Sequence, residues 1–385
     1  MKKKILRITT ISESLNILLK GQLGFLNQYF EVVGVADGEE LLAKVSEREG
    51  IRTVHIPIKR EISIFNDLKS LISLIRLIKT EKPYIVHANT PKGSLLGLIA
   101  AWYCGVPVRI YTVTGLRFET TAGNFRRLLI FMEKICCHCS THIIPEGDGV
   151  KQTLLKNNIT AKPINKILNG SINGIDLDFF NVNLISDQER FILWSKYKIS
   201  LDDFVFVFVG RLVNDKGINE LVEAFLKLKE LTNSKSLKLL LVGPFEEKLD
   251  PLLPSTIRII SENDAIISVG FQSDVRPFFA ISSCLVFPSY REGFPNVVLQ
   301  AGAMGLPSIV TDINGCNEII VNGENGIIVP KKNVERLYEA MKFYYENSMS
   351  LENSSKIARA MIESRYNQPK VWDALLQNYN SIINE

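Results

Sequence analysis

Cysteine, histidine and tryptophan are scarce in this sequence. Of 385 residues, six are cysteine, four are histidine and three are tryptophan. So few cysteines in so long a chain argue against a disulfide framework and for reduced, mostly structural thiols. The cluster CCHCSTH at residues 136–142 offers three thiols and two imidazoles, but no second ligand pair with zinc spacing accompanies it. We expect no metal there, since free cysteine is commonly a small buried hydrophobic residue.

Long apolar runs are absent as well. The richest stretches, residues 68–78 and 95–103, are interrupted or flanked by polar side chains. Both fall short of the roughly 18 apolar residues that a membrane-spanning helix needs. The N-terminus, MKKKILRITT, is basic but lacks the apolar core and the small-residue cleavage site of a secretion signal. We therefore expect a cytoplasmic protein, or one that is peripheral on the cytoplasmic face of the membrane.

Two further absences exclude classes of function. The first β-like run leads into TTISESLNILLKG and not into a Gly-x-Gly-x-x-Gly turn, which disfavours a dinucleotide-binding oxidoreductase. The formal charge of +4 and the pI near 8.6 fall short of a dedicated nucleic-acid binder, so we expect no nucleic-acid partner. A mildly basic chain still suits anionic ligands or an anionic membrane surface.

Short β-like runs alternate with helical patterns through the first half of the chain. This rhythm is typical of parallel βαβ units and predicts an α/β fold with a doubly wound sheet. The runs are residues 5–9, 31–36, 53–58, 84–88, 108–113 and 141–145.

The same rhythm restarts after a turn-rich crossing at residues 162–180, in which we expect one more short strand. The later β-like runs are residues 204–210, 237–243, 266–270, 284–289, 307–311 and 326–330. Beyond residue 333 the pattern is helical almost to the end. Four apolar or aromatic residues of the last helix are spaced for one buried face: Trp372, Leu375, Leu376 and Tyr379.

The length and the doubled rhythm predict two doubly wound α/β domains. We place the first at residues 1–178 and the second at residues 179–368. Ligands of such sheets bind at the carboxyl ends of the strands, so we expect a cleft between the two facing domains.

The stretch at residues 288–330 carries the first candidate site. An apolar strand ends at residue 287, a Pro-Ser-Tyr-Arg-Glu-Gly loop follows, and a helical pattern begins at Pro295, which suits a first helical position. The free N–H groups of Asn296 to Val298 could hold a phosphate, and Glu292 could point into the same crevice. An ordinary βα turn with a solvated glutamate is the alternative.

Arg211 and Lys216 form the second candidate site, in VGRLVNDKG directly after the strand FVFVFVG. Both leave the carboxyl end of a buried strand, so both could reach one anion such as a diphosphate. The alternative is that both residues are solvated cations of an ordinary loop. The second turn suited to phosphate, at Pro295, argues against this alternative.

These motifs resemble those of a known enzyme family. FVGRL with DKG, and the stretch from VGFQSD to INGCNEII, are similar to the C-terminal half of the retaining glycosyltransferases of family 4. That family has the GT-B fold of two facing Rossmann-like domains. The resemblance implies that a C-terminal helix at residues 369–385 joins the first domain. HANTPKGSLLG, VRIYTVTGLRF and NGIDLDFF resemble its bacterial capsule and O-antigen members, and the likeness covers essentially the whole chain.

The resemblance implies roles for particular residues. Arg211 and Lys216 would neutralise the nucleotide diphosphate, and Glu292 would bind hydroxyls of the donor sugar. Where the family has a second glutamate that binds the ribose, this chain has Gln300, whose amide keeps one acceptor. The remaining donor-binding residues implied are Gly293, Phe294, Pro295, Asn296 and Val297.

The acceptor side is less well marked. Thr114 stands where many relatives have a histidine or an acid, and it cannot serve as a strong base. His87 ends the run YIVHA and is a second candidate; for both residues a structural role is the alternative. Asp176 and Asp178 imitate an Asp-x-Asp metal motif, but their place in NGIDLDFF matches the family's domain crossing and indicates turn chemistry.

A basic and aromatic segment at residues 109–134 could rest on an anionic membrane. An ordinary amphipathic helix with a solvated basic face is the alternative. Its basic residues are Arg109, Arg117, Arg126, Arg127 and Lys134.

The resemblance as a whole implies a metal-independent, retaining hexosyltransferase without a cofactor. It would move a hexose or N-acetylhexosamine from a nucleotide-diphosphate sugar, expected to be UDP-linked, to a lipid-linked glycan acceptor on polyprenyl diphosphate in cell-surface polysaccharide synthesis. A nucleotide-sugar epimerase of the same architecture is one rival. A non-catalytic sugar-binding protein is another, and it would need neither Arg211 nor Lys216.

Overall fold

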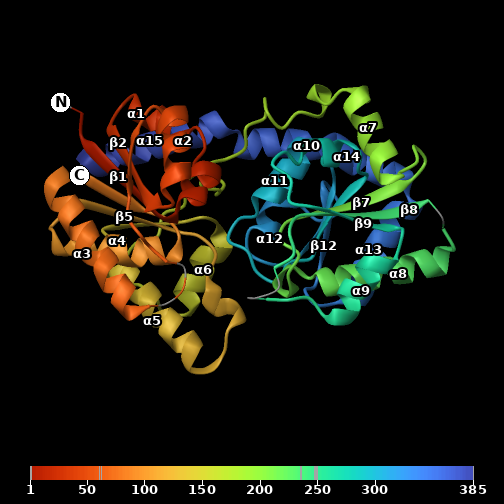
Figure 1. Cartoon of the computed structure of the whole chain (residues 1–385), viewed down its shortest axis with the longest axis horizontal. Helices are drawn as coiled ribbons and strands as arrows, with labels where there is room; N and C mark the ends of the chain where they lie inside the picture. The colour runs from red at the N-terminus through yellow and green to blue at the C-terminus, as the bar shows by residue number, and fades with distance from the viewer. Residues whose placement is uncertain (1, 60, 62, 235, 247–249, 385) are drawn as a thin grey trace. The chain divides into compact units, whose positions relative to one another are not determined.

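The computed structural model describes residues 2–59, 61, 63–234, 236–246 and 250–384 (Figure 1). The chain forms two compact units: Met1–Gly174 with Gln368–Glu385, and Ile175–Asn367. The division therefore falls after Gly174, where the sequence indicated residue 178. Each unit is an α/β domain with its own six-stranded sheet.

All strands of the first unit are parallel and lie in the order β3-β2-β1-β4-β5-β6. Each of the six β-like runs of the first half overlaps one of them. The strands are β1 (Lys4–Ile11), β2 (Glu31–Asp37), β3 (Arg52–His55), β4 (Ile85–Ala88), β5 (Val108–Val113) and β6 (His142–Pro145). Because the sheet is covered on both faces, β1, β2, β4 and β5 are buried along most of their length.

The extra short strand expected within residues 162–180 is not formed. Ile164 makes only an isolated bridge to Ile143. Pro163 beside it has no N–H with which to extend a ladder, and the following Asn-Gly sequences favour turns.

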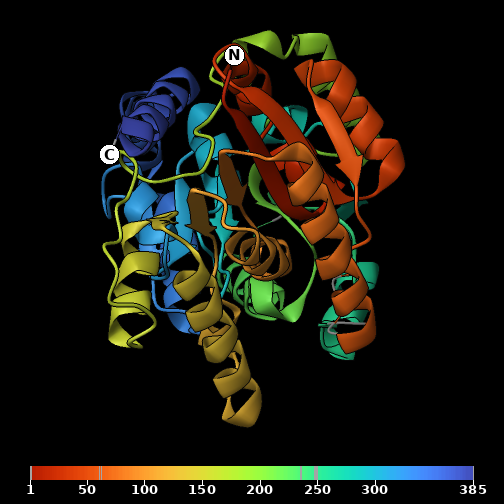
Figure 2. The ribbon, with the colours of Figure 1, turned by 90° about the vertical axis from the view of Figure 1, so that its left-hand side faces the viewer.

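Helices cover both faces of the first sheet (Figure 2). One face packs against α3 (Ile64–Glu81), α4 (Pro91–Tyr103), α5 (Gly123–Cys139) and α6 (Asp148–Lys156). The other face packs against the π-helix η1 (Ser14–Leu18), α1 (Gln22–Asn27), α2 (Glu39–Glu49) and α15 (Gln368–Asn384). The 3₁₀ helix η2 (Arg117–Thr120) precedes α5.

The last helix of the chain, α15, belongs to the first unit and lies beside β1 and β2 in Figure 1. Leu375 and Tyr379 are buried in the core, while Leu376 is partly buried against it. The Trp372 indole donates a hydrogen bond to Asn173 Oδ1 at 2.6 Å, so the face predicted from the spacing is the face that docks.

The second sheet repeats the order of the first, β12-β11-β10-β7-β8-β9, again all parallel. Its strands are β7 (Phe204–Val209), β8 (Leu237–Val242), β9 (Ile266–Gly270), β10 (Cys284–Phe287), β11 (Ser308–Thr311) and β12 (Gly326–Val329). The helices around it are α7 (Asp187–Tyr197), α8 (Ile218–Thr232), α9 (Pro254–Glu262), α10 (Arg276–Ala280), α11 (Asn296–Ala303), α12 (Cys316–Ile319), α13 (Val334–Glu346) and α14 (Ser348–Tyr366). Two 3₁₀ turns are η3 (Val182–Leu184) and η4 (Asn214–Lys216).

The chain crosses into the second unit through a capped turn. Asp176 Oδ1 accepts hydrogen bonds from the N–H groups of Asp178 and Phe179 at 3.1 and 2.9 Å. Arg359 on α14 donates to the carbonyls of Leu177 and Phe180, at 2.9 and 2.7 Å. The Asp-x-Asp sequence therefore does the turn chemistry that we predicted for it.

Candidate active site

Both predicted phosphate-binding segments lie at the same edge of the second sheet. From β7 the chain proceeds to β8 and β9 on one side, and then to β10, β11 and β12 on the other. The loops after β7 and β10 therefore leave neighbouring strand ends in opposite directions. This is the switch point at which open α/β sheets bind ligands.

The two loops are in direct contact with each other. The Tyr290 N–H donates to the Asp215 carbonyl at 2.8 Å, and Arg291 Nε lies 3.3 Å from Asp215 Oδ2. Gly217 has φ +70°, and a Cβ there would lie 2.2 Å from the Pro288 carbonyl oxygen. Glycine is therefore required for the loops to approach this closely.

Lys216 and Glu292 form an ion pair at the centre of this contact. Their side chains are only 19% and 17% exposed. Ser289, which is fully buried, donates from Oγ to Glu292 Oε1 at 2.8 Å. The Lys216 ammonium also lies 5.2 Å from the centre of the Phe287 ring. The hydrogen bond from Ser289 and the contact with the Phe287 ring thus hold Lys216 and Glu292 in place beside each other.

Arg211 does not join this pair in the structure described. Its guanidinium is about half exposed and forms an ion pair with Glu246, in the loop after β8. The sequence predicted that Arg211 and Lys216 could reach one anion. Both do follow β7, but each now has a carboxylate partner of its own.

The turn before α11 is closely packed. Gly293, Phe294 and Pro295 are buried, whereas Asn296 and Val297 are half-buried. Helix α11 begins at Asn296, one residue later than predicted, with Pro295 at the N-cap.

One of the three predicted backbone donors of this turn is already used. The Val298 N–H donates to the Pro295 carbonyl at 3.1 Å, which removes it from the set. The Asn296 and Val297 N–H groups have no acceptor among the residues that the structure describes. Two donors therefore remain at the positive end of the helix dipole.

Gln300 lies further along α11. Its side chain is half-buried and makes no hydrogen bond within the described part of the chain. The amide therefore keeps its acceptor and its donors for a ligand.

The two acceptor-side candidates lie in the first unit and differ from each other. His87 is 2% exposed, and its ring contacts Arg7, Tyr379 and Thr112. Both ring nitrogens are therefore used inside the domain, which fits the structural alternative and not contact with a substrate. Thr114 follows β5 in a coil and is half-buried.

Ser289 and Asp215 are parts of the site that the sequence reasoning did not single out. Ser289 holds Glu292, and the carbonyl of Asp215 holds the loop after β10. Ser289 stands three residues before Glu292 within the loop. Side chains at this spacing often contact each other, so the spacing could have indicated the hydrogen bond from the sequence.

The cysteine cluster lies in the core of the first unit. Cys136, Cys137 and Cys139 are buried and free, and burial raises the pKa of Cys137 to about 12. Within the residues described, no group of three or more His, Cys, Asp or Glu side chains is placed to hold a metal ion.

Helix α5 carries a mixed basic and apolar face and projects from the first unit (Figure 2). Leu128 and Phe131 are 44% and 60% exposed, and Arg127 and Lys134 are exposed beside them. Glu133 is turned inward, where the Tyr111 hydroxyl donates to it at 2.6 Å and burial raises its pKa to about 7. The outer face of the helix is therefore basic.

Two of the predicted basic residues are used internally. Arg126 donates to Asn157 Oδ1 at 2.7 Å, and Arg109 donates to the carbonyls of Cys139 and Val106, each at 2.6 Å. Their charges are therefore less available to a membrane than those of Arg127 and Lys134. None of the described helices is long and apolar enough to cross a bilayer.

Comparisons with known proteins agree with this architecture. The model of the glycosyl transferases group 1 matches residues 191–361, and that of the glycosyl transferase 4-like domain matches residues 13–146. The capsular polysaccharide biosynthesis glycosyltransferase CapM of Staphylococcus aureus is 34% identical over 387 residues, covering 100% of this chain and 98% of CapM. The UDP-Gal:alpha-D-GlcNAc-diphosphoundecaprenol alpha-1,3-galactosyltransferase of Escherichia coli is 28% identical, covering 87% of this chain and 85% of that protein.

Among solved structures, HepE of Anabaena in complex with UDP and glucose matches with a TM-score of 0.81 at 16% identity. The match covers 98% of this chain and 100% of HepE. The fold is therefore GT-B, with two Rossmann-like domains. The chain belongs to the family 4 glycosyltransferases of the bacterial capsule and O-antigen type.

Proposed function

We propose that this glycosyltransferase moves a hexose or N-acetylhexosamine from a UDP-sugar to a glycan on polyprenyl diphosphate, with retention of configuration and without a metal. The observation that carries the proposal is the Lys216–Glu292 pair at the switch point of the second sheet. The Escherichia coli relative is named for a UDP-sugar donor and a diphosphoundecaprenol-linked acceptor, which supports both substrate classes.

The donor diphosphate would bind across the two loops. Lys216 supplies a point charge, and Asn296 and Val297 supply N–H groups at a helix start. Arg211 would exchange Glu246 for the phosphates, since its side chain is half-exposed and its present partner lies in a neighbouring loop. Charge that develops on the departing UDP is then stabilised by groups already in place.

Glu292 would bind hydroxyls of the transferred sugar. Its carboxylate is an acceptor, and the bond from Ser289 fixes one oxygen while the other remains for the substrate. The ion pair with Lys216 would hold the same carboxylate close to the diphosphate.

In the transfer, the bond between the anomeric carbon and the UDP oxygen breaks, and the acceptor oxygen bonds to the same face of that carbon. The acceptor proton passes to the departing phosphate oxygen. A double displacement would need a second carboxylate about 5 Å away as nucleophile. Three acids near the contact between the loops already have partners. Asp215 pairs with Arg291, Glu220 accepts from the Tyr290 hydroxyl, and Asp250 accepts from the Asp215 N–H. The single-step, same-face route therefore suits these residues better.

Product analysis tests this proposal. Purified enzyme should convert a labelled UDP-sugar and a polyprenyl-diphosphate-linked glycan to an α-linked product in excess EDTA. Conversion of the donor without an acceptor would identify an epimerase instead. Activity lost in EDTA and restored by Mg²⁺ or Mn²⁺ would overturn the metal-independent part.

The exposed face of α5 would hold the enzyme against the anionic membrane that carries the acceptor. Leu128 and Phe131 would enter the interface, and Arg127 and Lys134 would meet lipid phosphates. Each basic residue near such a surface contributes about 1 kcal/mol and is screened by salt.

Reversing Arg127 and Lys134 to glutamate should weaken binding to anionic vesicles roughly tenfold or more, because two attractions become repulsions. Co-sedimentation with phosphatidylglycerol vesicles at low and high salt measures this. The charge-matched control Lys2→Glu with Lys44→Glu, at two other exposed lysines, should change binding little. If neither salt nor either pair of substitutions changes vesicle binding, α5 is an ordinary amphipathic helix that does not bind the membrane.

Gln300 should bind the ribose. Gln300→Leu should raise the donor KM roughly tenfold, because a ribose hydroxyl loses its partner. Gln300→Glu should preserve or tighten donor binding, since a hydrogen bond to a carboxylate is stronger. Steady-state kinetics with UDP-sugar decide. Unchanged KM and kcat in Gln300→Leu, together with a lower melting temperature, would make this residue a packing element only.

A further inference from the structure

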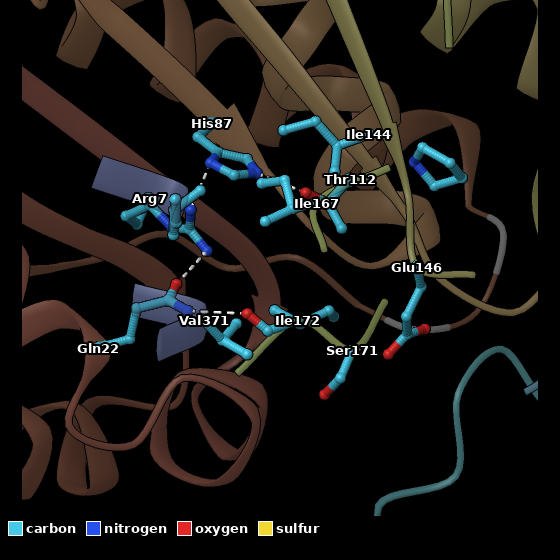
Figure 3. Close-up of a pocket in the computed structure, with 12 residues that line it drawn as sticks. Arg7, Gln22, His87, Thr112, Ile144, Glu146, Ile167, Ser171, Ile172 and Val371 are labelled. Atoms are coloured by element: carbon cyan, nitrogen blue, oxygen red, sulfur yellow. Dashed lines mark hydrogen bonds between the residues drawn. The ribbon is translucent and has the colours of Figure 1, made fainter. Parts of the chain in front are cut away.

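Arg7 is a fully buried cation on β1, one of the two central strands of the first sheet (Figure 3). It donates to Tyr379 Oη at 2.7 Å, to Asn89 Oδ1 at 3.0 Å and to Gln22 Oε1 at 3.2 Å. Within the residues that the structure describes, no carboxylate lies at ion-pair distance from it. A buried charge without a counter-charge is strongly unfavourable.

The hydrogen bonds around Arg7 determine where the protons lie. Arg7 Nη1 contacts both Tyr379 Oη and His87 Nδ1, and a guanidinium can only donate, so Nδ1 is an acceptor. The Tyr379 hydroxyl lies 2.5 Å from the same nitrogen. His87 therefore carries its proton on Nε2 and donates it to Thr112 Oγ1 at 2.6 Å. Burial, and then the charge of Arg7, lower the pKa of His87 well below its usual range, which keeps the ring neutral. The Thr112 hydroxyl proton is left without an acceptor among the described residues.

Two more donors in this network are unpaired. Arg7 Nε and Asn89 Nδ2 are both buried and have no hydrogen-bond partner. With the Thr112 hydroxyl, all three unsatisfied groups are donors, so the network lacks both an acceptor and a negative charge.

A small cavity adjoins this network (Figure 3). It is close to 20 Å³, and Arg7, His87 and Thr112 line it together with Gln22. This volume is enough for about one water-sized particle. Glu146 also lines the cavity, but its carboxylate points away from Arg7.

We propose that this cavity binds one monovalent, halide-sized anion, with chloride as the physiological ligand. The anion accepts hydrogen bonds from Arg7 Nε and the Thr112 hydroxyl and neutralises the guanidinium. A water molecule could accept the same bonds but would leave the charge of Arg7 uncompensated. Because Arg7 also holds Tyr379, the ion stabilises the docking of α15 on the first domain.

Crystals of the full chain grown in sodium bromide provide the direct test. An anomalous-difference peak should lie in the cavity, within hydrogen-bond reach of Arg7 Nε and Thr112 Oγ1. A cavity that holds only water, without an anomalous peak, would overturn the proposal.

Thermal unfolding in solution gives the second test. Replacing gluconate by chloride at constant ionic strength should raise the Tm of the wild-type chain by a few degrees, because the ion binds only the folded state. Thr112→Val removes one donor and should abolish most of this shift, whereas Thr112→Ser keeps the hydroxyl and should retain it. A chloride shift that is equal in all three proteins would place the effect elsewhere and contradict the proposal.

Discussion

Lys216→Ala should lower kcat/KM for the UDP-sugar by roughly two orders of magnitude. The ammonium stabilises charge that appears on the departing diphosphate, so its loss affects the transition state more than the ground state. The change also leaves Glu292, only 17% exposed, without its cation. Steady-state kinetics with labelled donor measure the effect.

Arg211→Ala should act in the same direction and weaken UDP binding, since its guanidinium adds charge to the same phosphates. Lys227→Ala is the matched control: Lys227 pairs with Glu335 on the surface of the same domain, and its loss should leave kinetics unchanged. If Lys216→Ala and Arg211→Ala both behave like Lys227→Ala, the assignment of the diphosphate to these loops is wrong.

Glu292→Gln should lower kcat by roughly one to two orders of magnitude with little change in donor KM. The amide has nearly the same shape, but it lacks the charge that stabilises the sugar as positive character develops at the anomeric carbon. Calorimetric titration with UDP alone should give a similar Kd for both proteins. A raised KM with unchanged kcat would instead make Glu292 a ground-state binding group.

Ser289→Ala provides a graded comparison with that variant. It removes only the hydrogen bond that fixes one oxygen of Glu292, so kcat should fall by less than in Glu292→Gln. A larger fall would mean that Ser289 contacts substrate itself.

The strands could be predicted because parallel strands that are covered on both faces have continuous apolar sequences. FVFVFV of β7 and CLVF of β10 are almost wholly apolar, and each is followed by turn residues. Helix α7 was overlooked, although Ser186 and Glu189 have the spacing of a capping box and form one. Its apolar residues are too few to give a strong periodic signal.

The loops that form the candidate site could be predicted from the sequence, but the ion pairs between their side chains could not. Motif and strand-end position placed Lys216 and Glu292 at one edge, but their ion pair depends on β7 and β10 being neighbours. Arg211 was predicted beside Lys216 and instead contacts Glu246, which belongs to a third loop. Partners that come from separate loops have no signature in a single sequence.

The role of His87 depends on a partner that is distant in the sequence. A histidine at a strand end is more often a core residue than part of a site, and the partner that decides for the core, Tyr379, lies 292 residues away on α15. Neither this separation nor the burial of Arg7 could be inferred before the two segments were known to pack together.

A crystal structure of the full chain with UDP tests the central claim most directly. The β-phosphate should lie within hydrogen-bond distance of Lys216 Nζ and of the Asn296 and Val297 N–H groups, with the ribose beside Gln300. UDP bound away from the loops after β7 and β10, with the Lys216–Glu292 pair undisturbed, would contradict the account.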